Sequence, residues 1–324
     1  MSEQVDAAAR LLGDRARRDV PIGPLTTYRV GGPAALALTV EDDADLAAVR
    51  DAVRESGVDV LIVGKGSNLL VADAGFDGLA VVLGDGFAPV AIDASTVVAG
   101  GAAPLPVVAR RTVAAGLTGF EWAVGVPGSI GGAVRMNAGG HGSDMAAVLA
   151  RVRVLDLRRG EDVWMPADSL ALGYRRSAIE AHQLVVAAEL QLHPGDPVAG
   201  EAALAEIVRW RRENQPGGQN AGSVFANPAG DAAGRLIDEA GARGLRLGTA
   251  KVSPKHANFI IADPGGKADD VVALMAAVRQ RVLDESGVLL EVETRLVGCT
   301  LDARASDPRS PDPQPREPRS EVEG

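Results

Sequence analysis

The stretch of sequence that decides the fold is Gly125-Val126-Pro127-Gly128-Ser129-Ile130-Gly131-Gly132. Glycines at this density do not form a strand or a stable helix interior, because glycine loses the most backbone entropy on folding. Backbone N–H groups that no Cβ atom shields can close around a phosphate. If Ser129 begins a short helix, the N-terminus of that helix also attracts anions. The segment therefore predicts a phosphate-binding loop.

A second glycine loop lies nearer the N-terminus, at Gly64-Lys65-Gly66-Ser67-Asn68. It follows the apolar run 58–63, which predicts a strand. It lacks the ending of a P-loop and the third glycine of a dinucleotide fingerprint, so by itself it is equally well a tight turn. Two such loops in one chain predict one dinucleotide cofactor, with its pyrophosphate between them. The residues expected to bind it are Gly64, Lys65, Gly66, Ser67, Asn68, Gly125, Pro127, Gly128, Ser129, Gly131 and Gly132.

The composition is that of a globular protein of about two domains, with 324 residues, 46% apolar and 23% charged. Lys and Arg number 33 against 43 Asp and Glu, for a net charge of −10. Such an acidic chain lacks the basic footprint of a nucleic-acid-binding protein, so we expect no nucleic-acid partner. Cys299 is the single cysteine, which excludes an internal disulfide and a multi-cysteine metal site. We expect no metal.

No targeting signal is visible, because residues 1–19 alternate small and charged side chains without an apolar core. No run approaches the roughly 18 apolar residues of a membrane-spanning helix, so neither membrane insertion nor a membrane partner is expected. A cytoplasmic monomer is the expectation. From Ala303 to Gly324 there are five prolines and nine charged residues. Such a segment cannot bury enough apolar surface to fold, so residues 299–324 are predicted to be a disordered tail.

Between these ends, strands and helices mix without strict alternation, which predicts an α+β fold. A Pro- and Gly-rich segment at 193–197 indicates a domain boundary. We therefore expect an N-terminal extension (1–18), a cofactor domain (19–195) and a second domain (196–298). Strands are predicted at 58–63, 79–83, 96–99, 151–157, 184–192 and 288–297, and helices around 46–53, around 105–112, from 204 to 214 and from 269 onward. In the last strand, Glu291, Glu293 and Arg295 would share one face.

Several motifs in a fixed order resemble those of the UDP-N-acetylenolpyruvoylglucosamine reductases, also called UDP-N-acetylmuramate dehydrogenases. The resemblance covers about residues 19–298. Besides the two glycine loops, the motifs are Thr27-Tyr28-Arg29-Val30-Gly31-Gly32-Pro33-Ala34, Tyr174-Arg175-Arg176-Ser177, Gly222-Ser223-Val224-Phe225-Ala226-Asn227-Pro228, Ala233-Gly234-Arg235-Leu236-Ile237-Asp238, Ser253-Pro254-Lys255-His256-Ala257-Asn258-Phe259-Ile260 and Leu290-Glu291-Val292-Glu293.

The resemblance implies a two-part FAD-binding domain of the p-cresol methylhydroxylase or vanillyl-alcohol oxidase type, followed by a smaller α+β substrate-binding domain. It implies non-covalent FAD and NADPH as co-substrate. The implied reaction is the reduction of UDP-N-acetylglucosamine enolpyruvate to UDP-N-acetylmuramate, a step of peptidoglycan precursor synthesis. The hydride would pass from NADPH to FAD, and from reduced FAD to the enolpyruvyl group.

The same resemblance implies Arg175, Ser223 and Glu293 as catalytic residues. A guanidinium can stabilise the charge that hydride addition pushes onto the substrate carboxylate. Ser223 is the implied proton donor. Glu293 either donates a hydrogen bond to that carboxylate when protonated or orients Arg175 when ionised.

Substrate binding is implied for Tyr174, Asn227, Arg212 and His256. A diphosphate needs positive charge, and Arg209, Arg211 and Arg212 all precede Ser223 closely. The sequence leaves open which of the three contacts it, and also whether they are only a solvated helix end.

Two other functions are compatible with the sequence. The first is an FAD-linked oxidase or dehydrogenase of the same fold that acts on an alcohol or a hydroxy acid. The second is a nucleotide-binding protein that kept the scaffold without the chemistry. The joint presence of Arg175, Ser223 and Glu293 favours the reductase.

Overall fold

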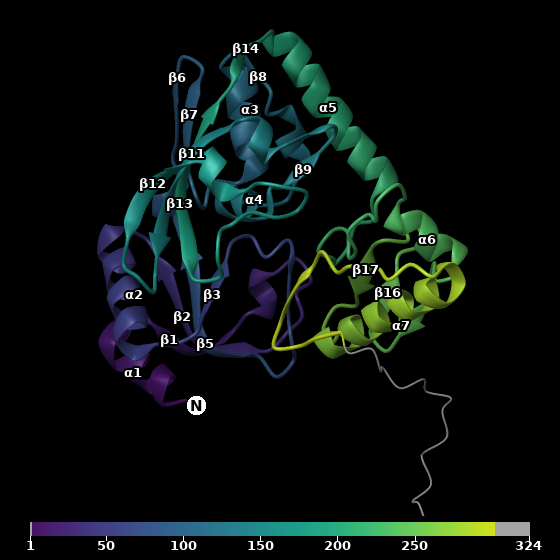
Figure 1. Cartoon of the computed structure of the whole chain (residues 1–324), viewed down its shortest axis with the longest axis horizontal. Coiled ribbons are helices and arrows are strands. Elements are labelled where there is room, and N and C mark those ends of the chain that lie inside the picture. The colour runs from purple at the N-terminus through teal and green to yellow at the C-terminus, as the bar shows by residue number, and fades with distance from the viewer. Residues whose placement is uncertain (1, 302–324) are drawn as a thin grey trace, which may run out of the picture.

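The computed structural model describes residues 2–301 and consists of three α/β units around a common centre (Figure 1). Most of the predicted tail, residues 302–324, lies outside the described residues. The described end of that segment includes Leu301, which packs against the core of the third unit. The mixed fold predicted from the sequence is confirmed.

The first unit is a four-stranded sheet in the order β1-β2-β5-β3. Its strands are β1 (Arg17–Pro21), β2 (Pro33–Val40), β5 (Phe76–Leu83) and β3 (Val60–Val63). β2, β5 and β3 run parallel, and β1 is antiparallel at the edge. Helices α1 (Glu3–Leu12) and α2 (Asp43–Ser56) bury Leu12 and Val49 in the same core as Leu36 and Val81 of the sheet. The segment 1–18, predicted as an extension, therefore contributes a helix to this core.

The second unit is a five-stranded antiparallel sheet in the order β12-β11-β13-β7-β6. Its core includes Val97, Val108 and Val152. Short pairs and turns connect the elements around it. The strands are β12 (Asp162–Pro166), β11 (Leu149–Asp156), β13 (Gln183–Gln191), β7 (Thr96–Gly100) and β6 (Val90–Asp93); the helices are α3 (Leu105–Ala114) and α4 (Ile130–Met136); the pairs are β9 (Gly139–Gly140) with β10 (Ser143–Asp144), and β8 (Leu117–Thr118) with β14 (His193–Pro194).

The long helix α5 (Pro197–Asn214) leads from the second unit to the third (Figure 1). Asp196 caps it, because the Asp196 carboxylate accepts hydrogen bonds from the backbone N–H groups of Val198 and Ala199. The segment 193–197, predicted as a domain boundary, lies at the start of this helix. The third unit comprises β15 (Arg246–Leu247), β16 (Ala250–Val252), β17 (Ile260–Ala262), α6 (Ala233–Glu239) and α7 (Ala268–Ser286).

The predicted strand Val288–Val297 is wrong in extent. Only β18 (Arg295–Val297) is a strand, and it pairs in parallel with β4 (Leu69–Val71), which directly follows the first glycine loop. Residues 288–294 run irregularly because they contact Phe225 of the third unit through an isolated bridge at Val292. Glu291 is consequently exposed, whereas Glu293 and Arg295 face the interior between the units.

A second contact between distant segments fixes the third unit to the first. The Asp73 carboxylate, just after β4, accepts hydrogen bonds from the backbone N–H groups of Ala268 (2.9 Å) and Asp269 (3.1 Å) at the start of α7. The Asp269 carboxylate in turn accepts one from the Asp73 N–H at 3.4 Å. These are the bonds of a capping box, made here across 196 residues of chain. With the β18–β4 pair, they hold the third unit beside the first glycine loop.

Candidate active site

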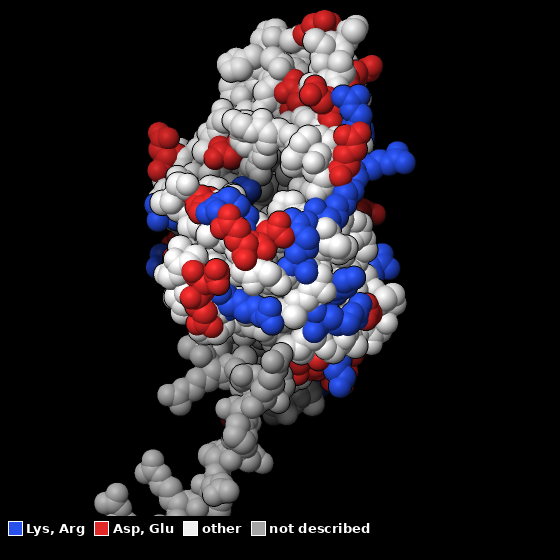
Figure 2. Space-filling view, turned by 90° about the vertical axis from the view of Figure 1, so that its right-hand side faces the viewer, with Lys and Arg blue, Asp and Glu red and all other residues white. Residues whose placement is uncertain are grey.

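A cavity of about 280 Å³ lies where the three units meet. Figure 2 shows a hollow on the side of the molecule that carries α5 and α6, with a basic side chain visible in its depth. The cavity walls come from both glycine loops, from α4 and from the segments around Arg175, Ser223 and Glu293. The structure therefore brings the predicted cofactor loops and the three predicted catalytic residues to one place.

The first glycine loop presents free backbone donors to this cavity. Within residues 2–301, the four backbone N–H groups from Lys65 to Asn68 donate no hydrogen bond. Gly66 has φ +58°, and a Cβ there would overlap the backbone of Leu25. Only glycine fits this turn without strain. Four successive free amides are what a phosphate needs, so the loop fits the pyrophosphate of a dinucleotide.

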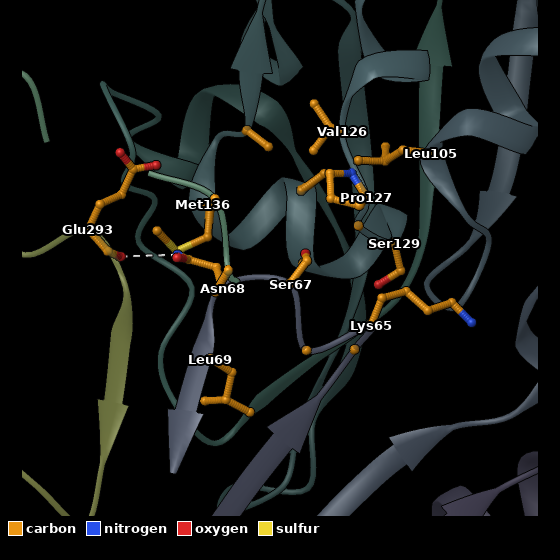
Figure 3. Close-up of a pocket in the computed structure, with 18 of the residues that line it drawn as sticks. Lys65, Ser67, Asn68, Leu69, Leu105, Val126, Pro127, Ser129, Met136 and Glu293 are labelled. Atoms are coloured by element: carbon orange, nitrogen blue, oxygen red, sulfur yellow. Dashed lines mark hydrogen bonds between the residues drawn. The ribbon is translucent and has the colours of Figure 1, made fainter. Parts of the chain in front are cut away.

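The second glycine loop faces the first across the cavity. Ser129 directly precedes α4, as predicted, and its hydroxyl lies 2.8 Å from the place where a Cβ on Gly64 would stand. In Figure 3, Glu293 lies on one side of the view and Ser129 lies with Lys65 on the other, with Asn68 and Ser67 between them. The cavity thus has an end with catalytic candidates and an end with phosphate-binding candidates.

A second cavity, of about 100 Å³, adjoins the larger one. Both cavities are lined by Lys65, Ser129 and Arg135, together with Ile62, Gly64 and Gly132. The other walls of the smaller cavity are mainly apolar, for example Leu184 and Val185 of β13. A mainly apolar space joined through polar donors to a larger cavity suits a long cofactor with a base at one end.

Most of the predicted cofactor residues line one of these cavities. Gly131 lines only the smaller one. Gly125 lines neither, because it lies against α5, where its Cβ would be 3.0 Å from the Ile207 side chain and 3.2 Å from that of Arg211. The absence of a side chain at Gly125 lets the loop pack closely against the helix. The remaining nine predicted residues, Gly64, Lys65, Gly66, Ser67, Asn68, Pro127, Gly128, Ser129 and Gly132, line the larger cavity.

Arg175 and Glu293 form an ion pair in the cavity wall. Arg175 Nε lies 2.8 Å from Glu293 Oε1, although the N–H is not aligned for a good hydrogen bond. A second guanidinium nitrogen of Arg175 donates to the backbone oxygen of Gly139 at 3.2 Å. Arg175 has φ +55°, a conformation that non-glycine residues rarely adopt. Such strain is typical of functional positions, where surrounding contacts hold a side chain in place.

The Glu293 carboxyl experiences two opposing effects. Burial raises its pKa above the ordinary value, while the positive charge of Arg175 lowers it, and burial has the larger effect. Its side chain is 14% exposed. The protonated form of Glu293 is therefore easier to reach near neutral pH than that of a surface glutamate.

Ser223 lines the same cavity and is positioned by a buried amide that the sequence did not indicate. The Asn258 side chain accepts a hydrogen bond from the Phe225 N–H (3.0 Å) and donates one to the Phe225 carbonyl (2.8 Å). The Glu293 N–H donates to the Val224 carbonyl at 2.8 Å. Ser223 and Glu293 are thus neighbours through the backbone. The only signal in the sequence was the place of Asn258 within a family motif.

Asn68 connects the first glycine loop to the catalytic segment. Its side-chain amide donates to the backbone oxygen of Glu293 at 3.0 Å, the bond drawn as a dashed line in Figure 3. Its backbone oxygen accepts from the Arg295 N–H, also at 3.0 Å. Asn68, predicted as a cofactor residue, thus lines the cavity and also holds the backbone of the segment that carries Glu293.

The cavity is strongly basic, which the overall charge of the chain conceals. Lys65, Arg135, Arg175, Arg211 and Arg295 line it, and Glu293 is the single acidic residue among its described walls. Of the three arginines near the end of α5, Arg211 lines the cavity, while Arg209 and Arg212 are exposed. Burial lowers the pKa of the Arg211 guanidinium. Anionic groups are the ligands that such a cavity favours.

The residues predicted to bind substrate lie outside the cavity wall. Tyr174 is 59% exposed, and its ring packs on Arg175, whose Cζ atom lies 5.2 Å from the centroid of the Tyr174 ring. The Asn227 side chain accepts a bond from the Ala233 N–H at the start of α6. Arg212 is exposed, and its backbone oxygen accepts a bond from Lys255. His256 packs against Phe259, and burial lowers its pKa.

Comparison with known proteins agrees with this geometry. A family model described as the C-terminal domain of UDP-N-acetylenolpyruvoylglucosamine reductase matches residues 214–297. The chain is 43% identical over 281 residues to the UDP-N-acetylenolpyruvoylglucosamine reductase of Heliobacterium modesticaldum, covering 86% of this chain and 89% of that protein. The chain belongs to the UDP-N-acetylenolpyruvoylglucosamine reductase family.

A family model for an FAD-binding domain matches residues 34–165, which include both glycine loops. The reductase of Rubrobacter xylanophilus is 40% identical over 295 residues, 90% of this chain and 99% of that protein. The crystal structure of the reductase from Thermus caldophilus superimposes with a TM-score of 0.76 at 35% identity, over 87% of this chain and 99% of that one. The chain is therefore an FAD-dependent oxidoreductase of this family. Among residues 2–301, no helix is long and apolar enough to cross a membrane.

Proposed function

We propose that the chain reduces UDP-N-acetylglucosamine enolpyruvate to UDP-N-acetylmuramate, with NADPH as reductant, as a cytoplasmic monomer in peptidoglycan precursor synthesis. The observation that carries this proposal is the convergence of Arg175, Ser223 and Glu293 in one basic cavity with the FAD-binding loops. Three segments far apart in the chain supply the three side chains. An oxidase of the same fold needs no such arrangement around a carboxylate-bearing substrate.

The chemistry that bound FAD supplies is hydride transfer, from NADPH to the enolpyruvyl group. Addition of a hydride to the terminal carbon of an enol ether pushes electrons toward the adjoining carboxylate. Arg175 is placed to hold that carboxylate, because its guanidinium lines the cavity and is only partly engaged by Glu293 and Gly139. A preformed cation next to developing negative charge lowers the barrier, since the protein does not reorganise during the step.

The second carbon of the former double bond must then gain a proton. Ser223 supplies it: Ser223 lines the cavity, and within the described chain its hydroxyl makes no hydrogen bond that would hold the proton elsewhere. A serine is a weak acid, but the carbanionic centre that it protonates is a strong base, so the transfer is favourable. The Asn258 clamp on Phe225 keeps the Ser223 backbone fixed relative to Glu293.

Arg211 supplies positive charge for the UDP diphosphate of the substrate. It enters the cavity from α5, near Gln215 and Asn220, which line the same wall. Tyr174, Asn227, Arg212 and His256 lie outside the cavity wall and would contact parts of the substrate that extend beyond it. Because the sequence contains no dinucleotide fingerprint for NADPH, NADPH uses the same cavity as the substrate, in alternation.

The test is direct. The purified protein, loaded with FAD, is mixed anaerobically with NADPH and then with the enolpyruvyl sugar nucleotide. The flavin absorbance should first disappear and then return, and mass spectrometry should detect a product that has gained two hydrogen atoms. Bleaching by an alcohol or a hydroxy acid rather than by NADPH would contradict the proposal in favour of an oxidase. Bleaching by NADPH without any reduced sugar nucleotide would contradict the assigned substrate.

Glu293 offers a further prediction. The substrate carboxylate brings a second negative charge to this site, which raises the pKa of Glu293 beyond the effect of burial. Protonated Glu293 then donates a hydrogen bond to that carboxylate. In Glu293→Gln, which keeps a neutral donor, kcat should fall within about tenfold, whereas Glu293→Ala should lose roughly 10²–10⁴-fold.

The pH profile distinguishes the two possible roles of Glu293. If the protonated acid is the active form, kcat/KM of the unmodified protein falls as the pH rises through the raised pKa of Glu293. Glu293→Gln should lose that decline. A Gln variant as inactive as the Ala variant would show that the ionised carboxylate is needed to orient Arg175.

A further inference from the structure

Within the described chain, three arginines of the cavity wall, Arg135, Arg211 and Arg295, have no acidic partner, and the charges of Arg135 and Arg295 influence each other. Arg295 lies two residues beyond Glu293, and its side chain makes no hydrogen bond or ion pair within the described chain. The nearest acid in sequence, Glu293, is already paired with Arg175 at 2.8 Å. A guanidinium that is largely removed from water and left unpaired is costly, so such a residue normally has a ligand as its partner.

Arg135 is the second of these cations. One of its terminal nitrogens donates to the backbone oxygens of Ile179 (3.1 Å) and Glu180 (2.5 Å). The Ser177 hydroxyl donates to the backbone oxygen of Arg135 at 2.7 Å. These bonds fix Arg135 at the end of α4. Burial lowers the pKa of Arg135 to about 10, and the nearby positive charge of Arg295 is the second, smaller cause. Both residues line the same cavity, and two like charges near each other favour an anion in the space that they line.

The position of Arg295 indicates which part of the cofactor supplies that anion, and in which oxidation state. The Arg295 N–H donates a hydrogen bond to the backbone oxygen of Asn68, and the Asn68 side chain donates one to the backbone oxygen of Glu293. Arg295 therefore belongs to the catalytic end of the cavity. The part of the cofactor that exchanges hydride must lie at this end, next to Arg175 and Ser223. Oxidised flavin is neutral in its ring system. A flavin that accepts two electrons and one proton carries a negative charge there, and positive charge nearby stabilises it.

We propose that Arg295, with Arg135 beside it, is the counter-charge of the reduced flavin ring and raises the reduction potential of the bound cofactor. These arginines are positioning and tuning residues rather than donors in the reaction. The inference rests on the proposed FAD chemistry, but it concerns the equilibrium between the oxidised and reduced cofactor and not the identity of the substrate.

The test measures the midpoint potential of the bound flavin by anaerobic titration with dithionite, so that neither NADPH nor sugar nucleotide is involved. In Arg295→Gln, the ratio of affinities for reduced and oxidised flavin should fall at least about tenfold, which lowers the potential by about 30 mV for a two-electron couple. Arg135→Gln should shift it in the same direction. Arg295→Lys, which keeps the charge, should restore most of the loss.

Arg211→Gln is the matched control, because Arg211 is a cation of the same cavity that enters from α5. It should leave the potential unchanged. Arg295→Gln and Arg135→Gln could instead weaken the binding of oxidised and reduced FAD equally and leave the potential constant. The two arginines would then bind the pyrophosphate, whose charge does not change with the oxidation state, and the proposal would fail. A normal shift in potential in a protein that does not reduce the enolpyruvyl substrate would overturn the proposed substrate and leave this inference intact.

Discussion

In Ser223→Ala, NADPH should still reduce the flavin at close to the normal rate, while reoxidation by the enolpyruvyl substrate should slow by roughly 10²–10⁴-fold, the usual effect of losing a general acid. Protonation belongs to the second half-reaction alone, since flavin reduction by NADPH needs no proton from Ser223. Substrate affinity should change little, because a neutral hydroxyl contributes only about 1 kcal/mol in an ordinary hydrogen bond. Anaerobic stopped-flow absorbance follows the two half-reactions separately.

Ser67→Ala is the matched control, because it removes a hydroxyl from the same cavity at a distance from Glu293 (Figure 3). It should weaken flavin binding modestly and leave reoxidation intact. The opposite pattern in Ser223→Ala, with slow flavin reduction and normal reoxidation, would move Ser223 from proton donation to NADPH binding.

The parts of the fold that depend on local sequence could be predicted. Helices with a regular apolar face, such as α2 and α7, lie where the spacing of their buried residues placed them. The strands β7, β11 and β13 also lie within a few residues of the expected positions. The strand predicted at 288–297 was wrong because its path depends on the bridge to Phe225 and on the pairing with β4. Alternating residue types cannot report contacts of that kind.

The candidate site divides in the same way. The glycine loops could be predicted because the residues that make each loop are consecutive in the sequence. The resemblance supplied Arg175, Ser223 and Glu293, but not the groups that hold them. Asn258 and Asn68 act through hydrogen bonds to distant backbone, at Phe225 and Glu293. No spacing in the sequence marks such a bond.

The basic residues show a further limit. A helix end with three arginines gave no means of choosing between them, and only the direction of α5 places Arg211 in the cavity while Arg212 faces solvent. For Arg295 the sequence indicated only a shared face with Glu291 and Glu293, and for Arg135 it carried no signal. Their proximity is a product of the tertiary fold.

Gly132→Val should give a folded protein that binds FAD poorly. Gly132 lines both cavities, and a Cβ there would meet only the Ser129 hydroxyl, at 3.8 Å. Valine is a better helix former than glycine, so α4 should not be destabilised. The branched side chain would instead occupy space that the cofactor needs. Overpacking of this kind costs roughly 1–3 kcal/mol, or about 5- to 150-fold in affinity.

Comparison of three variants separates loss of cofactor from loss of fold. Without FAD, Gly132→Val should melt at the temperature of the unmodified apoprotein, and fluorescence titration should show its weaker flavin binding. Gly66→Val should also lose FAD, but with a lower melting temperature, because its Cβ would overlap the Leu25 backbone and its φ of +58° does not suit valine. Gly140→Val, where a Cβ would have nothing within 4 Å and which lines neither cavity, should bind FAD normally. Full flavin affinity in Gly132→Val would mean that the cofactor does not pass between the two cavities at this point, and the assignment of the second glycine loop to its phosphates would have to be abandoned.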